Sequence, residues 1–346
     1  MSTESAVFSS RDFWFQDGDI VLSCRGANGH IMRYRVHKFM LTQHSVPFTD
    51  MLGTRALAAA PDLEHTLDGL PVVPLPEPAV EIYKLLSCLY NALSGAAFQD
   101  GQRPITGYDG LLRICDKYQI APLRQCVFAR LKTEWPTTLA EWDAREAHIA
   151  VLRQQHLDAR PSGRVHNLYL DDRLSEPVSI IGIARATGLL QLLPAAFYEL
   201  ARRDPRADWD VFHHPATRNL PANEQMLAQS MRSARWSALS AEDLLAFATS
   251  KERQLDCLRQ LMGQMCQREL PHPLCKVERD KLVNTTQEIA ILGRDPLAAA
   301  RWACSQIATT TICQPCRGST VHAFMLFRGS YWLALPTIFN HGKRSV

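Results

Sequence analysis

Hydrophobic and polar residues alternate first with the period of a β-hairpin. In the run DIVLSCR, Ile20 and Cys24 share one strand face with the leucine between them, and the later run IMRYRV alternates in the same way. The dipeptide Asn28-Gly29 separates the two runs and tolerates the positive φ angles of a tight hairpin turn. We therefore expect a β-hairpin within residues 12–36.

Helix-like spacing follows the hairpin. Ser45 is placed to cap a short helix, in which Pro47 fits the first turn and Phe48 points inward. Two later helices carry their apolar residues within 111–118 and 123–131. Before them, the run PVVPL predicts a short strand. A longer helix is then indicated by apolar residues spaced three and four apart, namely Ile82, Leu85, Leu86, Leu89 and Tyr90.

Strand-like alternation becomes scarce after about residue 145. The most apolar window, IIGIARATGLLQLLPAAF, is interrupted by Arg185, Gln191 and Pro194, so we interpret it as two buried helices and not as a membrane span. Ser240 is placed to cap another helix, and the run YWLALPTIF is expected to form short apolar elements. The patterns predict an α+β fold, in which a short sheet with helices precedes a mainly α-helical C-terminal region.

Composition narrows the class of protein. Of the 346 residues, 46% are hydrophobic and 21% are charged, which is typical of a folded protein. The formal net charge is +3, and no basic run indicates binding to nucleic acid. The N-terminal run MSTESAVFSSRDFWF lacks the cationic and apolar regions of a secretory signal. Ten cysteines without such a signal indicate reduced thiols in an intracellular protein, either cytoplasmic or nuclear.

The polar step His37-Lys38 stands where the strand pattern changes into a helix pattern. General acid–base catalysis by this histidine would need a nucleophile or a second acid or base nearby. The chain has no nucleophile-elbow, zinc-protease or phosphate-loop motif that would supply such a partner. We therefore expect His37 to cap or pack at the strand-to-helix junction, and we expect no catalytic residue.

The cysteines divide by context. One group lies on apolar faces of the expected elements and is expected to fill the core: Cys24, Cys88, Cys115 and Cys126. In the C-terminal region, Cys313 and Cys316 form Cys-Gln-Pro-Cys, whose two-residue gap lets both thiolates reach one ion. Cys266 and Cys275 offer a second pair with a looser spacing, and His272 could replace either of them. A structural zinc site and a redox pair are the two functional alternatives for this group.

Several of these residues together resemble the BTB/POZ domain. Asp19 opens the first expected strand, His37-Lys38 ends the second, and Leu41 and a Ser-x-x-Phe step beginning at Ser45 follow. The run PVVPLPEPAVEIYKLLSCLYNA is similar to the later strand and helix of that family. This combination identifies the N-terminal part of the chain as resembling a BTB/POZ domain.

The rest of the chain is similar to BTB-containing proteins that are abundant in mushroom-forming fungi. The similarity lies in the runs FWFQDGDIVL, DGLPVVPL, ICDKYQIAPLRQCVFARL, WPTTLAEWD and IIGIARATGLLQLLPAAFYELARRDP. It continues in the C-terminal cysteine pair and in an Arg-x-x-x-Trp-x-x-Leu-Pro ending that begins at Arg328. The resemblance implies three parts: an N-terminal tail at 1–11, a BTB/POZ domain with trailing helices at 12–135, and a helical region at 136–346.

The resemblance also implies a function, that of a protein–protein interaction adaptor or scaffold without catalytic activity. In BTB domains, the positions of Asp19 and Lys38 line a charged groove at the dimer interface, and His37 adjoins them here. The expected partners are proteins, including a second copy of the chain in a homodimer. No nucleic acid, membrane or small-molecule substrate is expected. The alternatives are a transcriptional regulator, a ubiquitin-ligase substrate adaptor, or an enzyme in the C-terminal region.

Recruitment of a cullin provides one specific expectation within that family. Many BTB proteins use a hydrophobic-x-Glu step after the helix that here carries Phe48. In this chain Glu64 is preceded two residues earlier by Asp62, which is not apolar. The resemblance therefore predicts weak or absent cullin binding.

Overall fold

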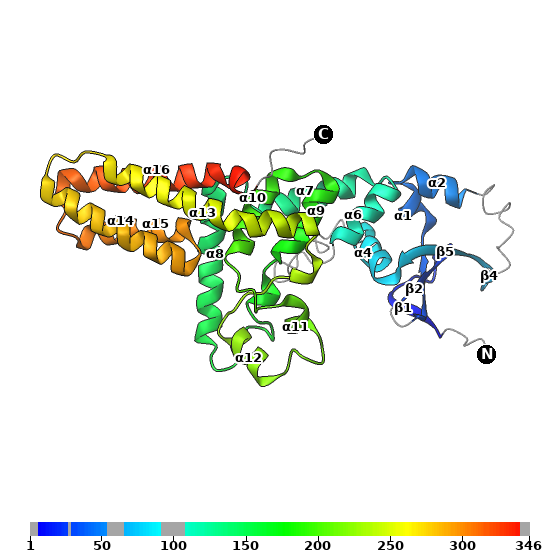
Figure 1. Ribbon diagram of the computed structural model, residues 1–346. Coiled ribbons are helices and arrows are strands. Elements are labelled where there is room, and N and C mark those ends of the chain that lie inside the picture. The colour runs from blue at the N-terminus through cyan, green and yellow to red at the C-terminus, as the bar shows by residue number, and fades with distance from the viewer. Residues whose placement is uncertain (1–5, 27–28, 54–65, 91–107, 340–346) are drawn as a thin grey trace. The chain divides into compact units, whose positions relative to one another are not determined.

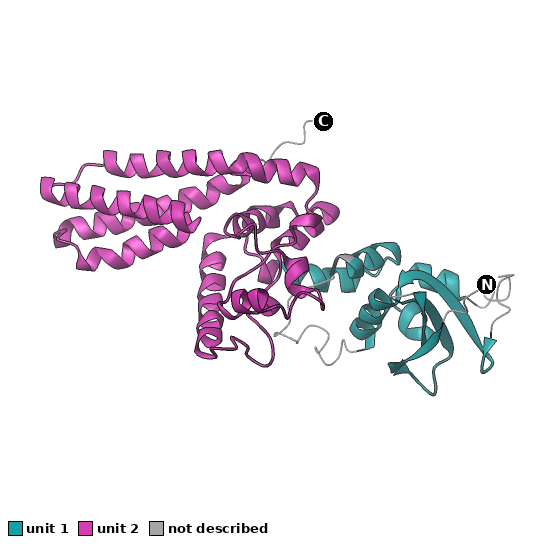
Figure 2. Ribbon diagram, turned by 60° about the horizontal axis from the view of Figure 1, so that its bottom comes forward, with its two compact units in different colours: residues 1–131 teal, residues 132–346 magenta. Residues whose placement is uncertain are grey.

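A computed structural model describes residues 6–26, 29–53, 66–90 and 108–339 of the chain. The chain divides into two compact units, residues 1–131 and residues 132–346 (Figure 2). The N-terminal unit contains a five-stranded sheet with helices, whereas the C-terminal unit is mainly helical (Figure 1). The expected α+β class is therefore confirmed.

The sheet has the strand order β1-β3-β2-β5-β4. β2 and β3 are antiparallel, with Ile20 opposite Val36, as the alternation of the hairpin predicts. β5 runs parallel to β2 and continues the sheet on its other side. The strands are β1 (Val7–Trp14), β2 (Ile20–Arg25), β3 (Ile31–Val36), β4 (Thr66–Leu67) and β5 (Leu70–Pro78).

β1 corrects the expectation of an N-terminal tail at 1–11, because residues from Val7 onward pair in parallel with β3. The strand lies at an edge of the sheet, and only Ser10 and Phe13 within it are buried. A strand with most side chains in water has little apolar alternation to reveal it. Of the expected hairpin turn, Asn28 lies outside the described residues.

Five helices accompany the sheet among the described residues: α1 (Lys38–Thr42), α2 (Val46–Leu52), α4 (Ala79–Tyr90), α6 (Tyr108–Lys117) and α7 (Ala121–Glu134). The predicted cap of α2 is confirmed, because Ser45 Oγ accepts a hydrogen bond from the Phe48 amide at 3.1 Å. The same hydroxyl donates to the Tyr118 carbonyl, and the Phe48 ring stacks on the Tyr118 ring. This cap therefore also ties α2 to the end of α6.

The predicted core stripe of α4 is confirmed for Ile82, Leu85 and Leu86, which are completely buried, whereas Leu89 and Tyr90 are only partly buried. Three of the four cysteines expected in the core are also buried. The exception is Cys126, which is exposed. Its neighbour Val127 takes the inward position on α7, so the prediction for Cys126 was wrong.

The C-terminal unit is built from helices of very different length. Its α-helices are α8 (Leu139–Asp158), α9 (Pro177–Thr187), α10 (Leu193–Ala201), α11 (Trp209–His213), α12 (Pro221–Ala228), α13 (Ala241–Gln267), α14 (Pro273–Gly293), α15 (Pro296–Gln306) and α16 (Gln314–Ile338). The most apolar window forms α9 and α10, as predicted, because Gly188 adopts a left-handed φ of 74° that ends α9. Within the described part of the chain, no helix is long and apolar enough to cross a membrane.

Helices α13 to α16 form a bundle, which we call the C-terminal bundle. α13 contacts α14 and α16, and α15 contacts α14 and α16, so the four helices enclose a common core (Figure 1). The short elements expected for YWLALPTIF were wrong, because all of this run except its last residue belongs to the 25-residue helix α16. Pro336 lies only two residues before the end of α16, so it interrupts little of the helix.

Elsewhere in the C-terminal unit, a buried carboxylate anchors α10. Glu199 is completely buried, and one of its oxygens accepts from Arg202 Nη1 at 2.8 Å. The other oxygen is paired with Arg203 and Arg232, and Arg145 Nη1 lies 3.6 Å from the carboxylate. Charges buried to this extent are tolerated only when they are paired.

Candidate metal centre

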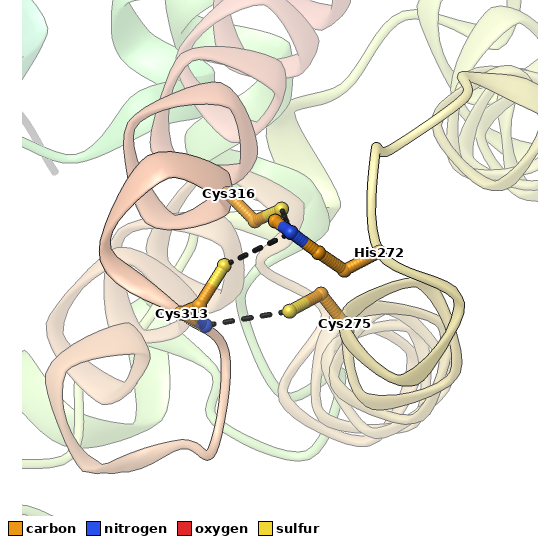
Figure 3. Close-up of side chains that lie close together, drawn as sticks. All are labelled: His272, Cys275, Cys313 and Cys316. Atoms are coloured by element: carbon orange, nitrogen blue, oxygen red, sulfur yellow. Dashed lines mark hydrogen bonds between the residues drawn. The ribbon is translucent and has the colours of Figure 1, made fainter.

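Four side chains that can ligate a metal converge at one end of the C-terminal bundle: His272, Cys275, Cys313 and Cys316. Their ligating atoms all lie within 4.8 Å of one another. Figure 3 shows the three sulfurs gathered around the imidazole ring, from two segments that are about forty residues apart in sequence. Three thiols and one imidazole in this arrangement could hold a metal ion.

The local structure explains why each pair of residues faces the same point. His272 is the N-cap of α14 and Cys275 is its third helical residue. Cys313 and Cys316 occupy the same two positions at the start of α16. Side chains at the N-cap and third positions of a helix lie close together, as the capping box illustrates. A proline in the first turn of both helices supports the helix start.

The distances between the side chains are short. His272 Nδ1 lies 3.2 Å from Cys313 Sγ and 3.3 Å from Cys316 Sγ (Figure 3). The Cys313 amide donates a hydrogen bond to Cys275 Sγ at 3.4 Å. Ile312 packs beside the buried Cys275 and Cys316, with Leu270 on their margin. The site is therefore sheltered on one side by apolar residues.

The surroundings shift the thiol pKa values in opposite directions. The Cys316 amide donates to the Cys313 thiol and lowers the pKa of Cys313. Removal from water raises the pKa of Cys316 to about 11, and the neighbouring thiols of Cys313 and Cys275 add to this effect. A bound cation would reverse the second shift, because metal binding displaces the thiol proton.

Cys266 requires a correction, since it was grouped with the ligands but is not a member of this cluster. It lies near the C-terminal end of α13, where its thiol interacts with the carboxylate of Asp280. The sequence left open whether His272 replaces Cys266 or Cys275. In the structure His272 lies with Cys275 in the cluster, in place of Cys266. The two runs His-Pro-Leu-Cys and Cys-Gln-Pro-Cys have the same spacing, and this could have indicated the four residues that converge.

In the N-terminal unit, Asp19, His37 and Lys38 lie in a different kind of site. Asp19 Oδ1 accepts a hydrogen bond from the Lys38 amide at 2.7 Å, so this carboxylate caps α1. The His37 amide donates to Tyr90 Oη at 2.8 Å, and the His37 ring lies 5.2 Å from the Phe15 ring. His37 thus packs at the strand-to-helix junction, as expected. A role for these residues in binding a partner stays a prediction, and Glu64 lies outside the described residues.

Comparisons with known proteins identify no relative of this chain. No protein-family model, no curated protein and no solved structure matches the chain. The resemblance to BTB/POZ domains and to the fungal proteins that contain them therefore stays a prediction. Function has to be inferred from the residues and contacts of the chain itself.

Proposed function

We propose that this chain is a non-catalytic scaffold that binds other proteins through its N-terminal unit, in the manner of a BTB/POZ domain. The observation that carries the proposal is the exposed edge strand β1. A sheet edge offers unpaired backbone donors and acceptors to a strand of another chain.

Two features of β1 support pairing with another chain. The strand pairs with β3 on one side only, so its other side is the edge of the described sheet. Val7 and Phe8 on this strand are 46% and 53% exposed, respectively. Proteins commonly protect an edge with charge or proline. On this edge the charges of Arg11 and Asp12 lie in the second half of the strand, and the first half carries large apolar side chains. A partner strand would cover them.

The charged residues Asp19 and Lys38, adjacent to the sheet, supply the second part of the proposed surface. Asp19 is exposed, and Lys38 begins α1 directly beside it. By resemblance to the BTB groove, a second copy of the chain would bring complementary charges to this position. Reversing one charge in a partly desolvated interface would place like charges together and weaken association.

Light scattering coupled to size-exclusion chromatography tests this proposal. The wild type is expected to form a dimer, and both Phe8→Lys and Lys38→Glu are expected to shift it toward monomer. Leu333→Lys is the matched control, because Leu333 is 78% exposed on α16 in the other unit. A wild-type protein that stays monomeric at every concentration, together with unchanged variants, would remove the self-association part of the proposal.

We also propose that the cluster at the end of the C-terminal bundle is a structural zinc site. Thiolate and imidazole are the ligands that zinc prefers, and four protein ligands leave no open position for a substrate. In a tetrahedral zinc site, bonds of about 2.0–2.3 Å separate neighbouring ligand atoms by roughly 3.5 Å. The distances from His272 Nδ1 to Cys313 and Cys316 are already close to this value.

Electrostatics supports the same proposal. Three thiolates and a neutral histidine around a divalent zinc ion leave one net negative charge. The N-termini of α14 and α16 both lie at the cluster, and the N-terminal end of a helix stabilises negative charge. The site therefore has compensation for the charge that zinc binding would create.

Cobalt titration of the metal-free protein tests the coordination directly. Tetrahedral cobalt with thiolate ligands absorbs strongly in the visible range, so we expect such bands with one equivalent of metal. His272→Ala should weaken and shift these bands, whereas Cys304→Ser should not, because Cys304 lies outside the cluster on α15. Absence of the bands in the wild type would contradict the proposed ligand set.

A further inference from the structure

The C-terminal unit contains a cavity of about 270 Å³ that is separate from the metal cluster. It lies beside the C-terminal end of α10 and is lined by residues of α13, α14 and α16. Its apolar wall includes Phe247 and Leu258 of α13 and Ala290 of α14, all of which are buried. Cavities of roughly this size and apolar character bind small molecules in other proteins.

Two buried polar groups on residues of this cavity have no partner. The hydroxyl of Tyr331 and the Nε of Arg203 form no hydrogen bond with the described part of the chain. Tyr331 is completely buried and Arg203 is 7% exposed. A buried tyrosine hydroxyl usually finds a partner, and an unsatisfied donor costs about 1–3 kcal/mol. Both residues line the cavity, and the two donor atoms themselves lie buried behind its surface.

The charged side chains that line the cavity are all positive. Its lining includes the cationic side chains of Arg203, Lys251 and Arg294, and no carboxylate. Glu199 neutralises Arg203 from the core side. Neither Lys251 nor Arg294 forms an ion pair with a carboxylate among the described residues, although Asp204 lies near enough to Arg294 for their charges to interact. The cavity therefore favours an anion.

The backbone places one of these cations in an unusual way. Arg294 follows the last residue of α14 and adopts a left-handed φ of 54°. Glycine is the usual residue at this position, because a side chain there costs roughly 1 kcal/mol or more. Arg294 Nη1 donates to the Arg203 carbonyl at 2.9 Å, which holds the guanidinium beside the cavity.

We propose that this cavity binds a small organic carboxylate with an apolar body. The carboxylate supplies the negative charge for Lys251 and Arg294 and lies beside the residues that carry the unpartnered donors. The apolar body fills the space against Phe247 and Leu258. A neutral apolar molecule would not supply this charge, and inorganic phosphate would leave the apolar wall uncovered. This site is independent of the proposed partner surface and of the metal cluster.

Isothermal titration calorimetry of the full chain with octanoate tests the proposal, with 1-octanol as the neutral probe of equal chain length. Octanoate is expected to bind one site per chain, at least about ten-fold more tightly than octanol, since charge-assisted hydrogen bonds distinguish the two. Lys251→Gln and Arg294→Gln should each weaken octanoate about ten-fold. Lys281→Gln on α14, the helix that Arg294 follows, is the control, because Lys281 does not line the cavity.

Tyr331→Phe provides a second and independent readout. The hydroxyl that it removes has no partner among the described residues, so the thermal midpoint without ligand is expected to stay the same or rise. Octanoate affinity should nevertheless fall. The proposal is overturned if octanol binds as tightly as octanoate, or if Lys251→Gln, Arg294→Gln and Tyr331→Phe leave octanoate affinity unchanged. Lys251 is exposed, so its substitution tests binding without disturbing the fold.

Discussion

Glu199 provides the sharpest test of how the C-terminal unit is held together. Its carboxylate is completely buried and is shared by Arg202, Arg203 and Arg232. We expect Glu199→Gln to destabilise this unit severely, because the substitution keeps the shape of the side chain and removes its charge. The arginines would remain buried with less negative charge to compensate them.

The expected loss of stability follows from the burial of both Glu199 and the arginines that surround it. Burial already lowers the pKa of Arg232 to about 10 and also lowers that of Arg203, so these cations depend on the nearby carboxylates to stay charged. Breaking a buried ion pair by neutralising one partner costs about 3–5 kcal/mol. The amide that replaces the carboxylate would also point a donor at the arginines. We therefore expect a loss in the upper part of that range.

Urea unfolding followed by tryptophan fluorescence measures the loss. All tryptophans except Trp14 lie in the C-terminal unit, so the signal reports on that unit. Glu224→Gln is the matched control, because its pair with Arg164 is far more exposed than Glu199 and should contribute less than about 1 kcal/mol. If Glu199→Gln lowered the free energy of unfolding no more than this control, the buried carboxylate would not be the anchor of α10.

Two further predictions concern the same unit. Burial by itself would raise the pKa of Glu146, but hydrogen bonds and charge from Arg202 lower it from 4.5 to about 2. The stability that Glu146 contributes to the fold is therefore complete above pH 4.5 and is lost as the pH falls toward 2. Urea midpoints at pH 7, 4 and 3 should fall less steeply in Glu146→Gln than in the wild type, and parallel curves would refute this. Ser240→Ala removes the cap of α13, in which Ser240 Oγ accepts from the Asp243 amide at 3.1 Å, and should cost about 1 kcal/mol in the same assay; an unchanged midpoint would contradict it.

Much of the fold could be predicted wherever burial leaves a periodic trace in the sequence. The inward stripe of α4, which includes Leu85 and Leu86, follows from one buried face. β2 is less regular, because Val21 is buried on the face opposite Ile20 and Leu22. β1 could not be found in this way, because most of its side chains are exposed. α8 was also not predicted, because only a few of its residues are buried. Its start is nevertheless marked by the Thr138–Glu141 capping box.

The candidate site shows where local patterns stop being informative. The two-residue gap between Cys313 and Cys316 predicts a shared ion from local geometry alone. The choice between Cys266 and His272 depends on how the turn between α13 and α14 directs each side chain, and spacing along the chain does not determine this. Tyr331 lies on α16 and Arg203 lies just after α10, far apart in sequence, so only the packing of the unit reveals that both line the cavity.

The zinc content of purified protein tests the proposed metal centre most directly. Elemental analysis should find one zinc ion per chain in the wild type and in Cys266→Ser, because Cys266 lies outside the cluster. Cys275→Ser should lose the zinc, and the C-terminal bundle should unfold at a lower temperature as a result. Wild-type protein without zinc, or equal zinc content in Cys275→Ser and the wild type, would contradict the proposal that His272, Cys275, Cys313 and Cys316 hold a structural metal ion.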